Sequence, residues 1–321
     1  MSPLVSIIIP VYNSANILRA TVETALAQSH MRKEIIIIDD GSTDNSYELA
    51  LSYQSESVRV VRQPNAGAAV ARNTGLALAN GELIQFLDAG DLLSTDKIEK
   101  QVTALRANPL KLAVCSYVQF TSADQLNSPS YPDQSSYIYS TDDPLDFLVN
   151  LWGGNGEMNF IQTNSWLVPR EIINRAGIWR NYRCPDDDGE FFARAILASE
   201  GIEFVPGVYN YYHISPGANQ LSTNKNRKYL QNTLLTIDLK HGYLLKKGKH
   251  PLISKAMASQ YLRFAVYQYP AQKTLSLIAY SRFQSFHEKV PIPNLGGKGI
   301  ELVKQIFGWR MARLIRYYFR E

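Results

Sequence analysis

Cysteine is scarce in this sequence, and long apolar runs are lacking. The two cysteines, Cys115 and Cys184, are too few and too far apart in 321 residues for a disulfide framework or a Cys-x-x-Cys metal site. One disulfide and two free thiols both fit this count, and free thiols are the simpler interpretation for a cytosolic chain. No stretch approaches the run of about 18 apolar residues that a membrane-spanning helix needs. The first ten residues also lack the basic and apolar regions of a signal peptide, so we expect a cytoplasmic protein.

Charge is moderate and unevenly distributed. Charged residues make up 19% and hydrophobic residues 45% of the chain, which is typical of a folded protein of about two domains. After residue 240, fourteen Lys and Arg oppose three Glu, a net +11, so the first 240 residues carry −7 of the total +4. A general nucleic-acid binder should be basic over its fold, so we expect no nucleic-acid partner. The pattern favours an acidic body for cations or polar substrates and a basic tail for an anionic surface.

The first hundred residues alternate between apolar runs and amphipathic segments. Strands are predicted at residues 5–9, 34–38, 58–61 and 83–87, with helices at 16–29 and 68–79. Apolar strands alternating with helices indicate a parallel sheet that is covered on both faces. Polar residues follow three of these strands, at the carboxyl ends where α/β sheets bind ligands.

Five motifs occur in order between residues 4 and 195. They are residues 6–13 (SIIIPVYN), 38–44 (IDDGSTD), 65–75 (NAGAAVARNTG), 81–91 (GELIQFLDAGD) and 186–194 (DDDGEFFAR). Together they resemble the family-two glycosyltransferases of the GT-A fold, which use nucleotide-diphosphate sugars. The resemblance implies an α/β fold with a mostly parallel central sheet flanked by helices. It places a GT-A domain at residues 1–225, with a nucleotide-sugar half at 1–115, an acceptor half at 116–225 and a basic helical extension at 226–321.

The same resemblance implies an inverting, metal-dependent transfer from a nucleotide-diphosphate donor, expected to be a UDP-sugar. The acceptor would be a glycan or lipid-linked glycan in surface polysaccharide biosynthesis. The family assigns Asp40 to uracil recognition, and Pro10, Tyr12 and Asn13 to the same nucleoside pocket. Taken alone, Asp40 fits an ordinary Asp-Gly-Ser turn, and Tyr12 fits a packed aromatic residue. Arg72 is expected to reach the nucleotide or to orient Asp88, against the alternative of a solvated helix face.

The segment Asp88-Ala89-Gly90-Asp91 carries the metal chemistry that the resemblance implies. A departing diphosphate is stabilised by a divalent cation, and Mg²⁺ or Mn²⁺ takes oxygen ligands from one or two carboxylates plus phosphates. Asp91 matches the family's direct metal ligand, and Asp88 matches the residue near the ribose and a metal-bound water. The family usually has Asp where this chain has Gly90, so one carboxylate is missing.

The acidic turn at residues 186–190 resembles the family's motif beside the acceptor. By register, Asp188 matches the general base that deprotonates the acceptor hydroxyl, and Asp187 and Glu190 are further candidates. The alternative is helix capping, for which Asp is favoured in any case. His213, in residues 211–217 (YYHISPG), resembles part of the family's closing loop and is a candidate ligand of the diphosphate or cation. A loop or core histidine is its alternative.

The tail at residues 297–321 combines a basic and an apolar face. Apolar residues follow three- and four-residue spacing at Ile300, Val303, Phe307, Met311, Leu314 and Tyr318, with Arg313, Arg316 and Arg320 opposite. We expect this helix to bind an anionic membrane surface on the inner face of the plasma membrane, as a peripheral association. The alternative is a helix docked on the body with a solvated basic face.

Two other functions share part of this pattern. A sugar-1-phosphate nucleotidyltransferase also binds a nucleotide and a cation, but it carries a Gly-rich loop with Arg and Lys after the first strand. Residues 10–16 (PVYNSAN) contain none of these residue types. A glycan-binding pseudoenzyme is compatible with Gly90, whereas Asp88, Asp91 and Asp188 argue for an active enzyme. We therefore predict a glycosyltransferase.

Overall fold

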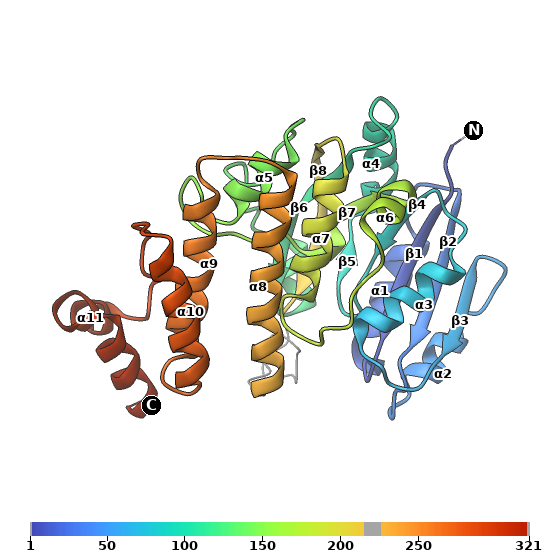
Figure 1. Ribbon diagram of the computed structural model, residues 1–321. Helices are drawn as coiled ribbons and strands as arrows, with labels where there is room; N and C mark the ends of the chain where they lie inside the picture. Colours follow the sequence, from blue (N-terminus) through green and yellow to red (C-terminus); the bar gives the residue numbers. More distant parts are fainter. Residues whose placement is uncertain (1, 215–225, 320–321) are drawn as a thin grey trace. The chain divides into compact units, whose positions relative to one another are not determined.

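The computed structural model describes residues 2–214 and 226–319, which form two compact units (Figure 1). The first unit comprises Met1–Pro144, Ile161–Arg183 and Asp187–Gln220. The second comprises Leu145–Phe160, Cys184–Asp186 and Leu221–Glu321. All five sequence motifs lie in the first unit, apart from Asp186. Each unit is therefore described separately.

The first unit is built on an eight-stranded sheet in the order β3-β2-β1-β4-β7-β6-β8-β5. Its strands are β1 (Val5–Val11), β2 (Lys33–Asp39), β3 (Val58–Arg62), β4 (Leu83–Phe86), β5 (Leu92–Leu93), β6 (Leu112–Phe120), β7 (Trp166–Pro169) and β8 (Ile202–His213). β1 pairs in parallel with β2 and β4, and β2 with β3, as the apolar runs predict. β7 is antiparallel to both β4 and β6, and β5 is antiparallel to β8, while β6 and β8 are parallel. This mixed α/β sheet confirms the expected fold class.

Helices cover both faces of the parallel strands. The helices of the first unit are α1 (Ala15–Leu26), α2 (Ser46–Leu51), α3 (Ala68–Leu78), α4 (Lys97–Leu105), α6 (Arg170–Ala176) and α7 (Asp187–Ala198), with 3-10 turns η1 (Ala123–Asn127) and η2 (Thr163–Ser165). Of these, α1 and α3 lie on opposite faces of β1. Side chains alternate across a strand, so β1 and β2 bury two apolar sets.

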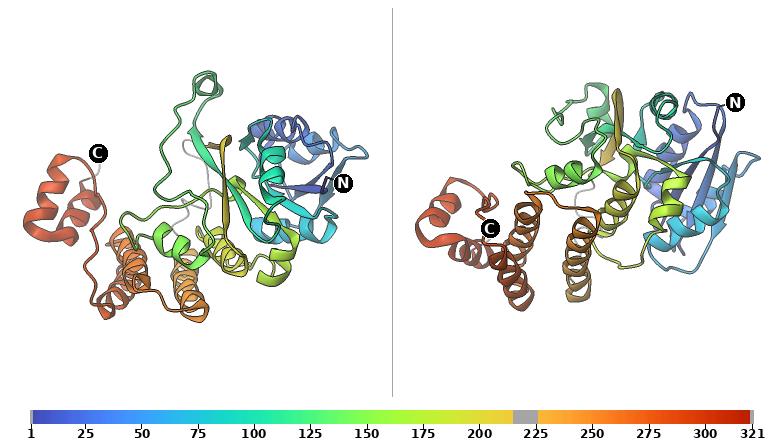
Figure 2. Two further views of the ribbon diagram at one scale, coloured as in Figure 1. Left: turned by 90° about the horizontal axis from the view of Figure 1, so that it is seen from above. Right: turned by 45° about the horizontal axis from the view of Figure 1, so that its top comes forward.

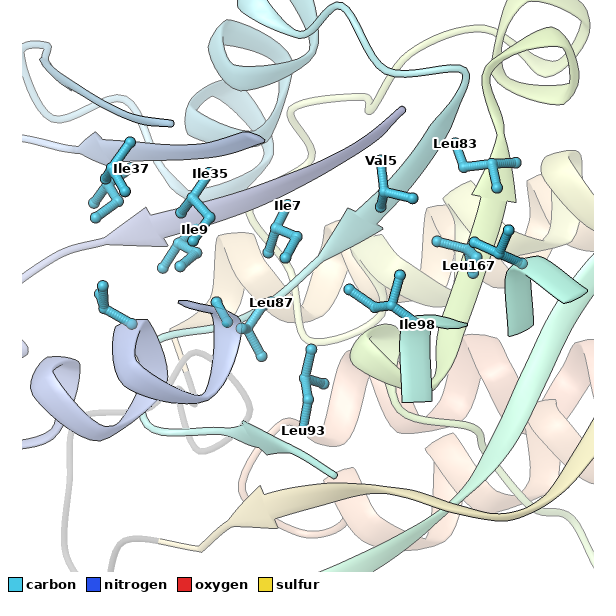
Figure 3. Close-up of a cluster of buried hydrophobic side chains, with 14 of the residues drawn as sticks. Val5, Ile7, Ile9, Ile35, Ile37, Leu83, Leu87, Leu93, Ile98 and Leu167 are labelled. Carbon is cyan, nitrogen blue, oxygen red and sulfur yellow. The ribbon is translucent and has the colours of Figure 1, made fainter. Parts of the chain in front are cut away.

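One set, which includes Ile7, Ile9 and Ile35, packs with Leu18 and Val22 of α1 (Figure 3). On the opposite face, α3 approaches β1 so closely that a Cβ at Gly75 would lie 2.4 Å from Ile8 Cγ2. Both faces of these strands are therefore buried, and the packing fixes the positions of the carboxyl ends of β1, β2 and β4.

The second unit is helical. It contains α5 (Pro144–Leu151) from its second residue onward, α8 (Arg227–Lys247), α9 (Ile253–Gln268), α10 (Lys273–Ser285) and α11 (Lys298–Tyr318) (Figure 2). Leu262 and Val266 of α9 pack with Trp309 and Ala312 of α11. α11 is broken at Gly308, whose φ of 81° interrupts the helix.

Two further expectations concern cysteine and membranes. Cys115 and Cys184 are both buried thiols outside any disulfide, which settles the alternative in favour of thiols. Within residues 2–214 and 226–319, every helix is too short or too polar to cross a bilayer.

Candidate functional site

Loops after β1 and β2 form the part of the site expected to bind the nucleoside. Asn13 has a φ of 48°, and its Oδ1 accepts a hydrogen bond from Thr43 N at 2.8 Å. Its own backbone N–H donates to Ser42 Oγ at 3.0 Å. These contacts tie the two loops together. Tyr12 is 50% exposed, so its ring is available to a ligand, and Pro10 is half-buried beside it in β1.

Asp40 organises the segment that leads into α3. Its carboxylate accepts hydrogen bonds from Ala66 N at 2.9 Å, Gly67 N at 2.8 Å and Gln63 Nε2 at 2.7 Å. Gly67 has a φ of 95°, a conformation that glycine adopts at little cost. The buried Asp40 is therefore a fixed carboxylate at the end of β2, in contact with the backbone of residues 66 and 67.

Arg72, on α3, lies among three carboxylates. Its guanidinium donates to Asp88 Oδ1 at 2.7 Å and stacks 4.4 Å from the centre of a Trp179 ring. Burial lowers the pKa of Arg72, but the charges of Asp88, Asp187 and Asp188 raise it, and the net shift is upward. The guanidinium thus links the loop after β4 to the first turn of α7. Arg72 is buried, in contrast to the solvated helix face that was its alternative.

Asp91 is a buried carboxylate at the end of the loop after β4. Its Oδ1 accepts the backbone N–H of His213 at 2.8 Å, and its Oδ2 accepts the side-chain amide of Asn164. Burial, and then the charge of Asp88, raise the pKa of Asp91 well above its ordinary value, although both hydrogen bonds lower it. Burial and a neighbouring carboxylate therefore disfavour its ionised form unless a cation is present.

The backbone accounts for Gly90. Its φ is 106°, and a Cβ there would lie 2.9 Å from Ile17 Cδ1 and 3.4 Å from His213 Nδ1. Its N–H donates to the buried hydroxyl of Thr21 at 2.8 Å. An aspartate in this conformation would be strained whatever the space around it. The positive φ and the contacts with α1 and β8 therefore exclude an unstrained aspartate at position 90.

The residues at the end of β4 suit a hard divalent cation that takes most of its ligands from the substrate. Among the described residues, no group of three or more His, Cys, Asp and Glu forms a ready-made metal cage. Mg²⁺ is commonly held by one or two carboxylates together with phosphate oxygens and water. Asp91 and the half-buried Asp88 supply that number, and the His213 ring lies beside Gly90. Residues 215–217 of the closing-loop motif lie outside the described residues.

Asp187 and Asp188 begin α7 in different environments. Asp187 is 8% exposed; burial and the nearby Asp188 and Asp88 raise its pKa to about 7, against the opposing charge of Arg72. Asp188 is half-buried: its Oδ1 accepts Gly189 N at 2.8 Å, and its Oδ2 lies 3.5 Å from Thr163 Oγ1. Asp188 is thus the more accessible of the two carboxylates.

Two other acids of the motif are held by basic side chains. Glu190 is fully buried and accepts two 2.9 Å hydrogen bonds from Arg194, which also donates to three backbone carbonyls of residues 176–178. Its carboxylate therefore fastens α7 to the end of α6. In the second unit, Asp186 accepts from Lys240 Nζ at 2.8 Å and from Thr236 Oγ1 at 2.7 Å.

Sequence reasoning missed two residues that contact this set. Asn164, fully buried in η2, accepts Asp88 N at 3.2 Å as well as donating to Asp91. Burial raises the pKa of Tyr212, and the charges of Asp91, Asp88 and Asp188 raise it further. Tyr212 adjoins His213 and could have been found there. Asn164 lies 73 residues from Asp91, and its sequence neighbours carry no motif.

Comparison with known proteins identifies the family of this chain. The family model "Glycosyl transferase family 2" matches residues 6–167. The glycosyltransferase GlyG of Streptococcus pneumoniae is 30% identical over 224 residues, which are 66% of this chain and 71% of that protein.

Two solved structures share the fold at low identity. Staphylococcus aureus TarS 1–349, in complex with UDP-GlcNAc, has a TM-score of 0.71 at 14% identity over 99% of this chain and 91% of that one. The mannosyltransferase PcManGT of Pyrobaculum calidifontis, in complex with GDP-Man and Mn²⁺, has a TM-score of 0.55 at 16% identity over 100% and 89%. By the match of the family model and the GlyG alignment, this chain belongs to glycosyl transferase family 2 and is a glycosyltransferase.

Proposed function

We propose that this glycosyltransferase moves a sugar, with inversion, from a nucleotide-diphosphate donor to a hydroxyl of a glycan or lipid-linked glycan in surface polysaccharide biosynthesis. One observation carries the proposal: Arg72 is hydrogen-bonded to Asp88, and the charges of Asp187 and Asp188 raise its pKa, so donor-side and acceptor-side carboxylates act on one guanidinium. A UDP-sugar is the favoured donor, because Asp40, Tyr12 and Asn13 match the nucleoside-binding positions of the family. The neighbour TarS binds UDP-GlcNAc, which agrees with this choice.

The donor side consists of the loops after β1, β2 and β4. Pro10, Tyr12, Asn13 and Asp40 bind the nucleoside at the ends of β1 and β2. Asp88 and Asp91 approach the diphosphate at the end of β4, with His213 beside them. A bound Mg²⁺ or Mn²⁺ would supply positive charge to the departing diphosphate. The structural neighbour PcManGT binds Mn²⁺ together with GDP-Man. We assign the GT-A domain to residues 1–225 and the basic extension to 226–321.

The acceptor side supplies the base. As the acceptor oxygen forms its bond to the anomeric carbon, the bond from that carbon to the phosphate oxygen breaks, and the nucleotide diphosphate leaves with the electron pair. The acceptor proton passes to Asp188. Asp187 is buried and, with its pKa raised to about 7, only partly ionised at neutral pH, whereas Asp188 is accessible and lies in the first turn of the same helix. The Glu190 carboxylate accepts hydrogen bonds from Arg194, so we assign it a structural role.

Asp188→Asn tests this assignment. The amide keeps the shape of the side chain but cannot accept the proton, and a positioned base contributes about 10²–10⁴-fold. We expect kcat for sugar transfer to fall by a factor in that range, while donor affinity changes only a few-fold. Asp187→Asn, measured at equal folded fraction, should retain more activity. If Asp187→Asn is the inactive variant, the base is one residue earlier; if both remain active, the acidic turn only starts the helix.

We also propose that residues 297–321 bind an anionic membrane surface, on the cytoplasmic face where the acceptor lipid would be glycosylated. Several large apolar side chains of α11 are exposed: Leu302, Ile306, Phe307, Met311, Tyr317 and Tyr318, with Phe319 directly after the helix. Apolar side chains of this size favour insertion between lipid headgroups.

A further inference from the structure

The loop that carries Asp88 and Asp91 is held from one side by a single amide. Asn164 Oδ1 accepts the backbone N–H of Asp88 at 3.2 Å, while its Nδ2 donates to Asp91 Oδ2. One fully buried side chain therefore fixes both the start of this loop and the orientation of the carboxylate at its end. Neither contact is made through helix or sheet hydrogen bonding, so both depend on where η2 places Asn164.

η2 is in turn held by a buried polar network. Gln85 Nε2 donates to the Asn164 carbonyl at 2.9 Å, and Gln101 Nε2 donates to the Ser165 carbonyl at 2.9 Å. Both glutamines accept from the ammonium of Lys97, at 2.5 Å and 2.8 Å.

Lys97, Gln85, Gln101 and Asn164 are all 0% exposed. Burying a lysine disfavours its charged form, and burial lowers the pKa of Lys97 to about 8. Among the described residues, no carboxylate forms an ion pair with this ammonium. It donates hydrogen bonds to the two amide oxygens instead. A core would be expected to avoid such a group unless it had a role.

We propose that Asn164 is a positioning residue that sets the Asp91 carboxylate for the divalent cation and diphosphate, and that Lys97 acts through Gln85 and Gln101 to hold Asn164 in place. This rests on the proposed metal-dependent use of Asp91. It goes beyond that proposal, since it gives two buried residues without contact to substrate an effect on cation affinity. Partners that orient a metal-binding carboxylate typically contribute about 10–100-fold to metal affinity.

The test is Mn²⁺ affinity in the presence of UDP, measured by calorimetry on the full chain. Asn164→Ala should lower the affinity for Mn²⁺ by about 10–100-fold and leave the affinity for UDP in EDTA unchanged. Gln134→Ala is the matched control, because Gln134 is a buried amide that bridges the backbone N–H and carbonyl of Tyr117 in the same unit. It should lower the unfolding temperature comparably without changing Mn²⁺ affinity. If Asn164→Ala and Gln134→Ala lower the affinity for Mn²⁺ equally, Asn164 has only a structural role and the inference is wrong.

Lys97→Met, alone and combined with Asn164→Ala, tests the second step. If Lys97 acts through Asn164, Lys97→Met alone lowers the affinity for Mn²⁺. The double variant then has the same Mn²⁺ affinity as Asn164→Ala alone. Additive losses would overturn this route. If Lys97→Met does not fold, Gln101→Met, which removes one of the two links, takes its place in the cycle. If UDP binding by the wild type does not depend on Mn²⁺, the proposed metal-dependent function is wrong. If UDP binding by the wild type depends on Mn²⁺ but Asn164→Ala has the wild-type affinity for Mn²⁺, only the inference about Asn164 is wrong.

Discussion

Asp187 shows what burial does to a single carboxyl group in this site. Its pKa is raised from 3.8 to about 7, first by burial and then by neighbouring acids. Between these two values the folded chain keeps a proton that the unfolded chain has lost. The free energy of unfolding therefore falls as pH rises through this window, and above pH 7 the folded state carries the full penalty of a buried charge.

Asp187→Asn should remove this dependence, because an amide does not titrate. Without ligands, the variant should gain on the order of 2–3 kcal/mol over the wild type between pH 5 and pH 8, at about 1.4 kcal/mol per pKa unit. Urea unfolding at the two pH values measures this gain. Asp124→Asn, in the exposed η1, is the control. A difference between Asp187→Asn and wild type that does not change with pH would show that Asp187 is ionised throughout.

The residue scale also shows what the sequence could and could not predict about the site. Asp40, Arg72, Asp88 and Asp91 each follow a recognisable strand or lie in a quoted motif, so their positions could be anticipated. Asn164 could not, because its role arises only when η2 is brought against the loop after β4. The Gly90 departure was visible in the sequence, but its cause, a positive φ against Ile17 and His213, belongs to the folded loop.

Among the elements, α11 differs from the amphipathic helix that its spacing predicts. Gly308 breaks it, and on both sides of the break some apolar side chains are packed and others are exposed. Ile300 and Val303 pack with the buried Trp309, whereas Phe307, Met311 and Tyr318 are exposed. Arg313 donates to the carbonyls of Tyr267 and Tyr269 at 2.9 Å and 3.0 Å, and Arg316 donates to the carbonyl of Leu295.

These arginines therefore donate to backbone carbonyls, near the end of α9 for Arg313 and just before α11 for Arg316, in place of a solvated basic face. Arg320 lies outside the described residues. One side of α11 therefore packs on α9 within the second unit, and its other side keeps large apolar side chains exposed. Periodicity could not separate the two, because it does not show where a helix breaks or which arginines find carbonyls.

Vesicle binding tests this element. The double variant Phe307→Glu/Met311→Glu should bind phosphatidylglycerol–phosphatidylcholine vesicles at least about tenfold more weakly, since burying one such side chain contributes about 1.5–3 kcal/mol. Leu235→Glu changes a comparably exposed apolar residue on α8 and serves as the control. Sedimentation of both variants with the same vesicles would reject the proposal for α11, as would a wild type that stays in the supernatant.

At the scale of the whole molecule, the parallel strands β1 to β4 were predictable and the remainder of the sheet was not. Continuous apolar runs identify strands that are buried on both faces. The antiparallel insertion of β7 between β4 and β6, and the pairing of β5 with β8, depend on contacts between distant segments. Those pairings bring His213, on β8, to Asp91, and η2, just before β7, to the loop after β4.

We propose that this fold assembles Asp91 into a cation-dependent site for a nucleotide diphosphate. Calorimetric titration of UDP into the full chain, in Mn²⁺ and in EDTA, tests it most directly. Wild type should bind UDP at least about tenfold more tightly in Mn²⁺, because a metal ion stabilises phosphate charge by several kcal/mol. Asp91→Asn should bind UDP no more tightly in Mn²⁺ than in EDTA. The surface variant Asp124→Asn should bind UDP as the wild type does under both conditions. An Asp91→Asn variant that loses UDP affinity equally under both conditions, or a wild type indifferent to Mn²⁺, would contradict the account.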